Sequence, residues 1–448
     1  MMSIPDEHGF HRPDSEALDA RVLLFLTVVA ALAGVVSGLV GGSFRWLLQR
    51  ADDWRLDLIH WALAHSPVGW LVPVVVSGLA AAAGTLIALR VPRSAGSGIQ
   101  HVEAVERGEA DPPTLSVLPA RFIGGLLSIG AGGLVLGREG PTVHMSAAIG
   151  AAAGRFVRAS ADEIRGLQTV LAGTGLAVAF NAPISAAMFV FEEIAKTVTT
   201  RYVVWTLAAV TTGVASSRFI LGNHPDFRVG AVHTPALTTL PLFVVFGAVV
   251  AALGVLYNWL IRACLELFAG PPRIPAPLKS AGLGAVIGML LLIHPDMVSG
   301  GDALSQQILD GSGYSMLAVV ALLAARFIAG PLSYSVGTPG GIFAPMLALG
   351  ALTGLLADKL VALVSQELGA QLLVPLVMVG MSSLFASVVR APFTGIVLVV
   401  EMTAVANVTI PMLAAGATAV IVASLVHSPP IYDALRERML RNERREAR

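Results

Sequence analysis

The sequence of this 448-residue chain is poor in cysteine and in charge. Its single cysteine, Cys264, excludes an intrachain disulfide and gives no basis for a cysteine-based metal centre. Charged residues make up 13% of the chain, and 29 basic side chains balance 29 acidic ones. A chain without net charge has no overall attraction for phosphates, so we expect no nucleic-acid partner.

Common catalytic motifs are also missing. The sequence contains no His-Glu-x-x-His metal motif and no Gly-x-Ser-x-Gly nucleophile elbow. A glutamate alone in an apolar segment cannot carry out hydrolysis. We therefore expect neither an enzyme nor a bound metal or other cofactor.

Apolar residues are abundant. They make up 55% of the chain, and the mean hydropathy is +0.76. At about 20 residues per spanning helix, the length allows more than ten membrane segments. The first apolar run, 22–40, is too long for the core of a signal peptide and is expected to be a membrane helix. These features predict an all-α, polytopic membrane protein surrounded by lipid, with helices of mixed length because glycine, proline or charge interrupts many runs.

The ends of the chain are polar. We expect residues 1–20 to form an N-terminal tail and residues 436–448, which include six arginines, to form a basic C-terminal tail. Arginine-rich ends tend to stay in the cytoplasm. The expected location is a bacterial inner (plasma) membrane with both termini cytoplasmic, and we expect no regulatory domain after the last apolar run.

Two halves of the sequence resemble each other. The matched segments, in order, are 94–97 with 299–302, 121–123 with 326–328, 137–141 with 341–345, Gly150 with Gly354, and 182–192 with 391–401. All are separated by 204 to 209 residues. We predict a first membrane repeat at 21–230 and a second at 231–435, which join in the polar stretch 222–239. Broken apolar segments at matched positions indicate a transporter built from repeats, which we expect to be inverted.

Glu139 is a charge in an otherwise apolar stretch. Its surroundings read Gly-Arg-Glu-Gly-Pro from 137 to 141. A charge at membrane depth is costly and tends to mark an ion pathway or a site. The flanking glycines and proline expose backbone N–H groups that suit an anion. The glutamate therefore looks like a competitor for an anion held by the same groups.

Four signatures occur in one order along the chain. They are Gly-Ser-Gly-Ile at 96–99, Gly-Arg-Glu-Gly-Pro at 137–141, Gly-Ile-Phe-Ala-Pro at 341–345, and Tyr432 near the end. In this order and spacing the chain resembles the CLC family of chloride channels and chloride/proton antiporters, of the prokaryotic type without CBS domains. The resemblance covers about residues 20–435. It implies a CLC-like fold of broken and tilted helices and a homodimer with one pathway in each subunit.

The resemblance also assigns roles to individual residues. It implies that the hydroxyls of Ser97 and Tyr432, with the backbone N–H groups of Ile342 and Phe343, bind chloride. It implies that Glu139 is the gating glutamate and outer proton acceptor. Neutral donors suit conduction because they bind an anion without trapping it. Gln100 stands where the family commonly has proline, and the sequence leaves its effect on anion selectivity open.

A second acid decides between the two functions of the family. The resemblance implies that Glu193 is the internal proton acceptor of antiporters, at a position where channels of the family carry an apolar residue. We therefore predict exchange of chloride for protons, with a passive chloride channel as the alternative. The neighbouring Glu192 matches Glu401 in the other repeat and is expected to be a structural capping or dimer-stabilising acid.

Each of these residues also has a purely structural interpretation. Glu139 could be neutralised by Arg138, and Glu193 could be a solvated acid beside Lys196 at a helix end. Ser97 could be a small turn residue, and Tyr432 could be an interfacial aromatic anchor. Three further residues, Glu103, His101 and His144, are expected to be structural.

Overall fold

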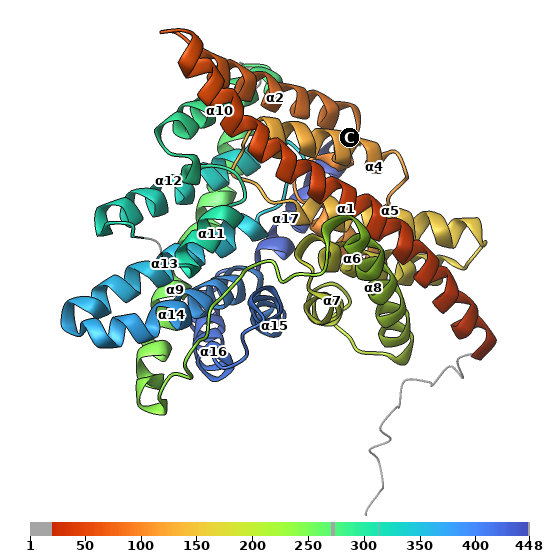
Figure 1. Cartoon of the computed structure of the whole chain (residues 1–448). Helices are drawn as coiled ribbons and strands as arrows, with labels where there is room; N and C mark the ends of the chain where they lie inside the picture. Colours follow the sequence, from red (N-terminus) through yellow and green to blue (C-terminus); the bar gives the residue numbers. More distant parts are fainter. Residues whose placement is uncertain (1–19, 270–273, 312, 447–448) are drawn as a thin grey trace, which may run out of the picture.

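The computed structural model describes residues 20–269, 274–311 and 313–446, and within them the regular structure is helical apart from two isolated backbone bridges. The expected N-terminal tail 1–20 therefore lies, except for Ala20, outside the described residues. Figure 1 shows how the helices pack, with α1 running across the face in view. In the first half the helices are α1 (Ala20–His65), α2 (Leu71–Arg90), α3 (Ile99–Glu106), α4 (Val117–Gly125), α5 (Glu139–Phe156), α6 (Ala161–Phe180), α7 (Pro183–Phe189) and α8 (Thr200–Leu221). In the second half they are α9 (Leu240–Phe268), α10 (Ala276–Ile293), α11 (Asp302–Leu309), α12 (Met316–Ser335), α13 (Phe343–Val364), α14 (Gln366–Val389), α15 (Pro392–Thr403), α16 (Thr409–Leu425) and α17 (Ile431–Glu446).

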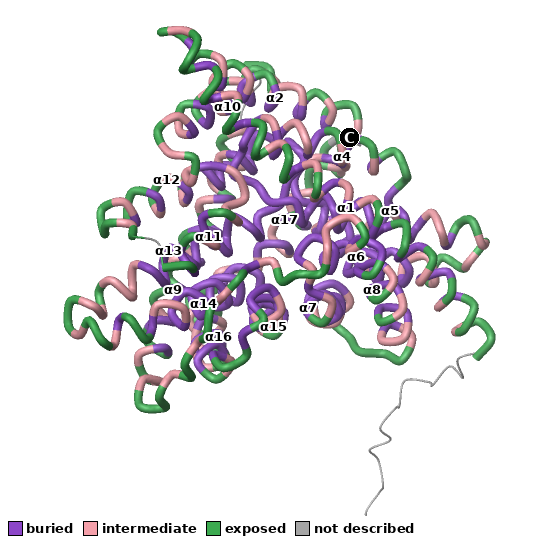
Figure 2. Tube along the Cα trace, viewed as in Figure 1, coloured by how far each residue is buried: buried purple, intermediate pink, exposed green. Residues whose placement is uncertain are grey.

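The helices differ widely in length, as the interrupted apolar runs predict. In the described part of the chain, eight are long and apolar enough to cross a membrane. By contrast, α3 and α11 have eight residues each and α7 has seven. Buried residues concentrate in the central helices (Figure 2). Many of the exposed residues on the peripheral helices are large and apolar. This distribution suits a protein surrounded by lipid.

The two halves repeat the same packing scheme. Helix α1 packs on α8 and α5 on α6, just as α9 packs on α16 and α13 on α14. Equivalent helices also contact each other directly, because α2 packs on α10 and α7 on α15. Contacts between equivalent elements are the pattern that a two-fold axis between the halves produces. Helix α17 follows the second set. It contains residues 436–446 of the predicted tail 436–448, which are the part of that tail that the structure describes.

Glu192 and Glu401 tie the two repeats together. Glu192 accepts hydrogen bonds from the backbone N–H groups of Phe393 and Thr394 at the start of α15. Glu401 accepts from Ile184 and Ser185 at the start of α7. A carboxylate near the first N–H groups of a helix satisfies donors that have no partner within the helix. The capping role expected for Glu192 is thereby confirmed.

One segment of the sequence alignment is wrong by two residues. Matching 94–97 to 299–302 pairs Ser97 with Asp302. In the structure, Gly96 (φ 62°) corresponds to Ser299 (φ 59°), and Gly98 (φ 84°) corresponds to Gly301 (φ 95°). The sequence match followed residue type, whereas the positive backbone angles before each short helix determine the true register.

Candidate functional site

The two Gly- and Pro-containing pentapeptides meet in the middle of the molecule. Gly137 and Gly341 exchange two backbone hydrogen bonds of 2.8 Å each. Beside them, the N–H of Gly96 donates to Thr338 at 3.1 Å, and the N–H of Gly340 donates back to Gly96 at 3.2 Å. Three loops from distant parts of the chain therefore converge where α5 and α13 begin.

Glu139 lies at this meeting point as the first residue of α5. It is fully buried, and its Oε1 accepts a 2.6 Å hydrogen bond from the backbone N–H of Phe343, the first residue of α13. Its Oε2 is buried and has no hydrogen-bond partner among the described residues. The carboxylate thus lies between two helix N-termini, whose N–H groups attract negative charge.

Glycine is required on both sides of this carboxylate. A Cβ atom at Gly137 would lie 2.0 Å from Glu139 Oε2, and one at Gly341 would lie 2.3 Å from Oε1. Any larger residue would displace the carboxylate. The glycines of both pentapeptides therefore provide the space that Glu139 occupies.

Ser97 and Tyr432 contribute two buried hydroxyls. Both residues are fully buried, and in the part of the chain that the structure describes neither hydroxyl has a hydrogen-bond partner that meets normal geometry. Ser97 lies against the start of α5, because a Cβ at Gly140 would be 2.7 Å from its Oγ. The Tyr432 ring packs edge-on against Phe343 with 5.5 Å between ring centroids. Two orphan donors beside Glu139 are chemically suited to bind an anion.

Ile342 and Tyr334 complete the surroundings. Ile342 precedes α13 and is buried, with its backbone next to that of Phe343. The hydroxyl of Tyr334 accepts a 3.3 Å hydrogen bond from the N–H of Ser97. The sequence analysis missed Tyr334, since no motif marks it. Gln100 lies beside this tyrosine and lines a cavity of about 270 Å³ that also includes Arg93, His101 and Arg438.

Glu193 lies apart from Glu139, in the π-helical turn Val190–Ile194 that follows α7. It is buried, and its Oε1 has no partner among the described residues. The ionisable groups around it include Glu103 of α3 and Lys196. Tyr432 is within electrostatic range of both Glu139 and Glu193. Glu193 is therefore buried rather than solvated at a helix end.

Asp433 connects this region to a cluster of basic residues at the surface. It pairs with Arg107 at 2.7 Å, with Arg436 at 3.3 Å and with Lys196 at 3.4 Å. Burial acts to raise the pKa of Asp433, but Lys196, Arg107 and Arg436 outweigh it, so the pKa is lowered from its usual value. The carboxylate stays charged at neutral pH.

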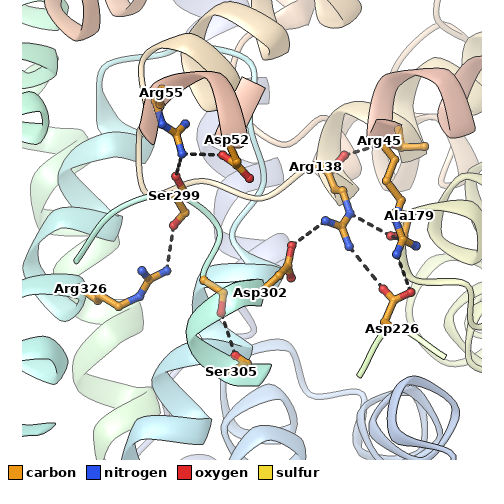
Figure 3. Close-up of polar contacts among 12 residues, drawn as sticks. Arg45, Asp52, Arg55, Arg138, Ala179, Asp226, Ser299, Asp302, Ser305 and Arg326 are labelled. Atoms are coloured by element: carbon orange, nitrogen blue, oxygen red, sulfur yellow. Dashed lines mark hydrogen bonds and ion pairs between the residues drawn. The ribbon is translucent and has the colours of Figure 1, made fainter. Parts of the chain in front are cut away.

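Arg138 forms no hydrogen bond or ion pair with Glu139, although the two residues are adjacent in the chain. Its guanidinium donates to Asp302 at 2.6 Å, to Asp226 at 3.3 Å and to the carbonyl of Ala179 at 3.0 Å (Figure 3). Arg45 donates to the same Asp226 at 2.7 Å. Because the Arg138 side chain is occupied by these partners, the Glu139 carboxylate remains free to interact with the α13 N-terminus.

A larger cavity of about 660 Å³ lies beside this network of ion pairs. Arg55, Arg326, Asp52, Asp296 and Asp302 line it together with Tyr314. Several of these groups pair with one another, as Figure 3 shows for Arg55 and Asp52. The described residues contain no group of three or more histidine, cysteine or acidic side chains able to hold a metal ion.

The comparisons with known proteins agree on one family. Residues 78–424 match the family model described as voltage gated chloride channel. The H(+)/Cl(-) exchange transporter ClcA of Vibrio cholerae serotype O1 is 35% identical over 433 residues, which cover 94% of this chain and 90% of the relative. ClcA of Vibrio parahaemolyticus serotype O3:K6 is 36% identical over 430 residues, with 93% and 90% covered.

Solved structures agree with this assignment. The crystal structure of a slow cyanobacterial Cl-/H+ antiporter is 30% identical and superposes with a TM-score of 0.87 over 93% of this chain and 98% of that one. A CLC-type fluoride/proton antiporter, 20% identical, shares the fold with a TM-score of 0.72 over 92% and 97% of the two chains. Together with the membrane-length helices, these likenesses confirm the predicted CLC-like helical fold of a multi-pass integral membrane protein.

Proposed function

This chain belongs to the family of voltage gated chloride channels, and on that premise we propose that it is a secondary active transporter that exchanges chloride for protons across the membrane. The proposal rests on the hydrogen bond that the Glu139 carboxylate accepts from the backbone N–H of Phe343. A second buried acid, Glu193, lies in the π-helical turn after α7. The relatives named as H(+)/Cl(-) exchange transporters support it.

The proposed chloride site uses neutral donors. Ser97 and Tyr432 supply hydroxyls, and Ile342 and Phe343 supply backbone N–H groups at the start of α13. Their hydrogen bonds replace part of the hydration shell of the ion without adding a full positive charge. Chloride is therefore bound weakly enough to leave again, as transport requires.

The proposed gate is the Glu139 carboxylate. It holds the Phe343 N–H that chloride also needs, so the two anions compete for one position. Protonation removes the negative charge of Glu139 and with it the attraction to the helix N-terminus. The carboxyl then leaves, chloride takes its place, and one proton has entered the pathway.

Glu193 is proposed as the internal proton acceptor. Its burial and its unpartnered Oε1 leave an oxygen available to take up a proton. Lys196 and Asp433 lie toward the surface, where protons are exchanged with water. A titratable group at each end of the buried region meets the need of proton transfer for a donor and an acceptor.

We place both termini in the cytoplasm of a bacterial plasma membrane. The basic residues Arg93, Arg107 and Lys196 gather around α17, which is itself rich in arginine. An excess of basic residues on one side supports a cytoplasmic position for that side.

We also propose a homodimer. The short helices α7 and α15 lie side by side and expose the equivalent residues Ile184 and Phe393, which are 63% and 55% exposed. Just behind them, Glu401 and Glu192 place carboxylates near the surface. A second copy would cover these acids, whereas lipid would leave them facing hydrocarbon. The double variant Ile184→Asn with Phe393→Asn should convert a two-chain mass in light scattering to one chain, and Leu79→Asn on exposed α2 should not.

Exchange is tested by proton uptake into liposomes under a chloride gradient without other driving ions. Uphill proton movement that follows the chloride gradient is the expected result. Chloride flux without proton movement would instead identify a passive channel, and no flux of either ion would contradict transport altogether.

A further inference from the structure

Three buried side chains form a hydrogen-bonded chain beside the Ser97 loop. Arg121 Nε donates to His144 Nδ1 at 2.6 Å, and His144 Nε2 is 2.8 Å from His101 Nδ1. Arg121 and His144 are fully buried, and His101 is 2% exposed. The two imidazoles meet edge to face with 5.0 Å between centroids. None of these residues has a part in the exchange described above.

The direction of the hydrogen bonds follows from the chemistry of arginine. A guanidinium can only donate, so His144 Nδ1 is an unprotonated acceptor. The proton of His144 therefore lies on Nε2 and is donated to His101 Nδ1, which leaves the His101 proton on Nε2. Both imidazoles are neutral in this arrangement.

Arg121 uses its other N–H groups to hold the loop that carries Ser97. A guanidinium has five N–H donors, and Arg121 has five acceptors, so His144 completes the set. With His144 in place, no N–H group of this buried guanidinium is left without an acceptor. The four carbonyl acceptors are those of Gly96 at 2.8 Å, Ser97 at 3.0 Å, Arg93 at 3.0 Å and Ala95 at 3.2 Å.

The second repeat builds the equivalent loop without imidazoles. Arg326 holds the carbonyls of Val298 and Ser299 in the same way, but its Nε is buried without a partner among the described residues. The surroundings of the glycine before each short helix show that Ala348 takes the place of His144 in the second repeat. A Cβ at Gly98 would meet the His144 ring, whereas one at Gly301 would meet Ala348. The fold of this loop therefore does not depend on a histidine.

The two imidazoles lie in the repeat whose loop carries the Ser97 hydroxyl. In the other repeat, Gly300 takes the place of Ser97 and offers no hydroxyl. We propose that His144, supported by His101, is a positioning residue for the anion site and acts through Arg121. By completing the hydrogen bonds of Arg121, it holds the carbonyls of Gly96 and Ser97 in place and so fixes the backbone from which the Ser97 hydroxyl reaches the anion site. This inference rests on the chloride site of the proposed function.

The test is chloride binding to the purified full-length protein by calorimetry, with nitrate as the second anion. His144→Ala should weaken chloride binding about tenfold, the effect expected from one lost hydrogen bond to a charged group. It should also reduce the preference for chloride over nitrate. His144→Gln should restore binding to within about threefold, because its amide can accept from Arg121 and donate to His101.

The matched control is Leu304→Ala. Leu304 is buried in α11 at the position of the second repeat that corresponds to His101, so its truncation opens a similar space away from Ser97. It should leave chloride affinity and selectivity unchanged. Wild-type affinity and selectivity in His144→Ala, or equal losses in His144→Gln and His144→Ala, would overturn the inference.

Two further outcomes keep the inference and the proposed function separate. If His144→Ala does not fold, His101→Leu is the deciding variant, because the equivalent loop of the second repeat has leucine at this position. His101→Leu should weaken chloride binding by about threefold. Unchanged chloride binding in this variant would overturn the inference. If the unaltered chain binds no chloride, the proposed function fails. If it binds chloride but moves no protons, the exchange fails while the inference on His144 is still tested.

Discussion

The Glu139 carboxylate accepts a 2.6 Å hydrogen bond from the backbone N–H of Phe343, the residue at the equivalent position of the other repeat. Each is the first residue of its helix, so the two helix N-termini face each other across one carboxylate. The repeat symmetry is broken at this point: one half supplies the acid and the other supplies the donor. The proposed competition between acid and anion rests on this asymmetry.

Glu139→Gln should separate the two ion fluxes. Glutamine has nearly the same shape but carries no charge, so it neither competes strongly for the Phe343 N–H nor takes up a proton. We expect chloride flux to persist and proton uptake to fall to the level of empty liposomes. Proton uptake that stays at the wild-type level in a pH-sensitive dye assay would refute the gate.

Glu193→Gln should abolish proton movement by removing the acceptor at the other end of the buried region. The chloride donors are untouched, so chloride efflux should remain measurable with a chloride electrode. Glu367→Gln, at an exposed position in the first turn of α14, is the matched control and should keep both fluxes. Unchanged coupling in Glu193→Gln would indicate another internal acceptor.

Gly341→Ala should displace the gate. Its methyl group would lie 2.3 Å from Glu139 Oε1 and 2.8 Å from the backbone nitrogen of Gly140, so the backbone must move. We expect a loss of about 1–3 kcal/mol in the free energy of unfolding, measured by denaturation in detergent, together with reduced chloride flux. Gly282→Ala in α10, where nothing lies within 4 Å, should be neutral or slightly stabilising.

Glu401→Gln should weaken the contact between the repeats. The carboxylate accepts two backbone hydrogen bonds, at 2.9 and 2.7 Å, from the first turn of α7. Glutamine offers one oxygen and no charge, so we expect a loss of about 1–2 kcal/mol in unfolding free energy. Glu367→Gln is again the control, because the exposed Glu367 side chain caps no helix of the other repeat. An unaltered melting temperature in Glu401→Gln would contradict the capping role.

Asp433 should contribute to stability at neutral pH and lose this contribution in acid. Because its folded-state pKa is lowered, the stabilisation is present above the unfolded-state pKa and disappears as the pH falls through the folded-state value. Asp433→Asn should therefore cost at most about 1 kcal/mol between pH 5 and 8, since partly exposed ion pairs are screened. The melting curves of the two proteins should converge below about pH 4. A gap that widens in acid would contradict this assignment.

The breaks in the apolar runs could be predicted from the sequence because they depend on local chemistry. Glycines and prolines at 137–141 and 341–345 interrupt helices wherever they occur, and a glutamate among them needs a polar partner. The register of the Ser97 loop could not be predicted in the same way. It depends on positive φ angles at Gly96 and Ser299, and residue identity alone does not reveal them.

By itself, the sequence determined that the chain is helical, lies in a membrane and is divided into related halves, because hydropathy and glycine–proline breaks act within short segments. It also identified Glu139, whose charge contrasts with its apolar neighbours. Only the tertiary structure decided that Phe343 is the donor to this acid, that Tyr334 supports Ser97, and that Arg138 is held by Asp226 and Asp302. Each of these contacts joins residues far apart in the sequence, so no local pattern specifies them and the packing of the two repeats brings them together.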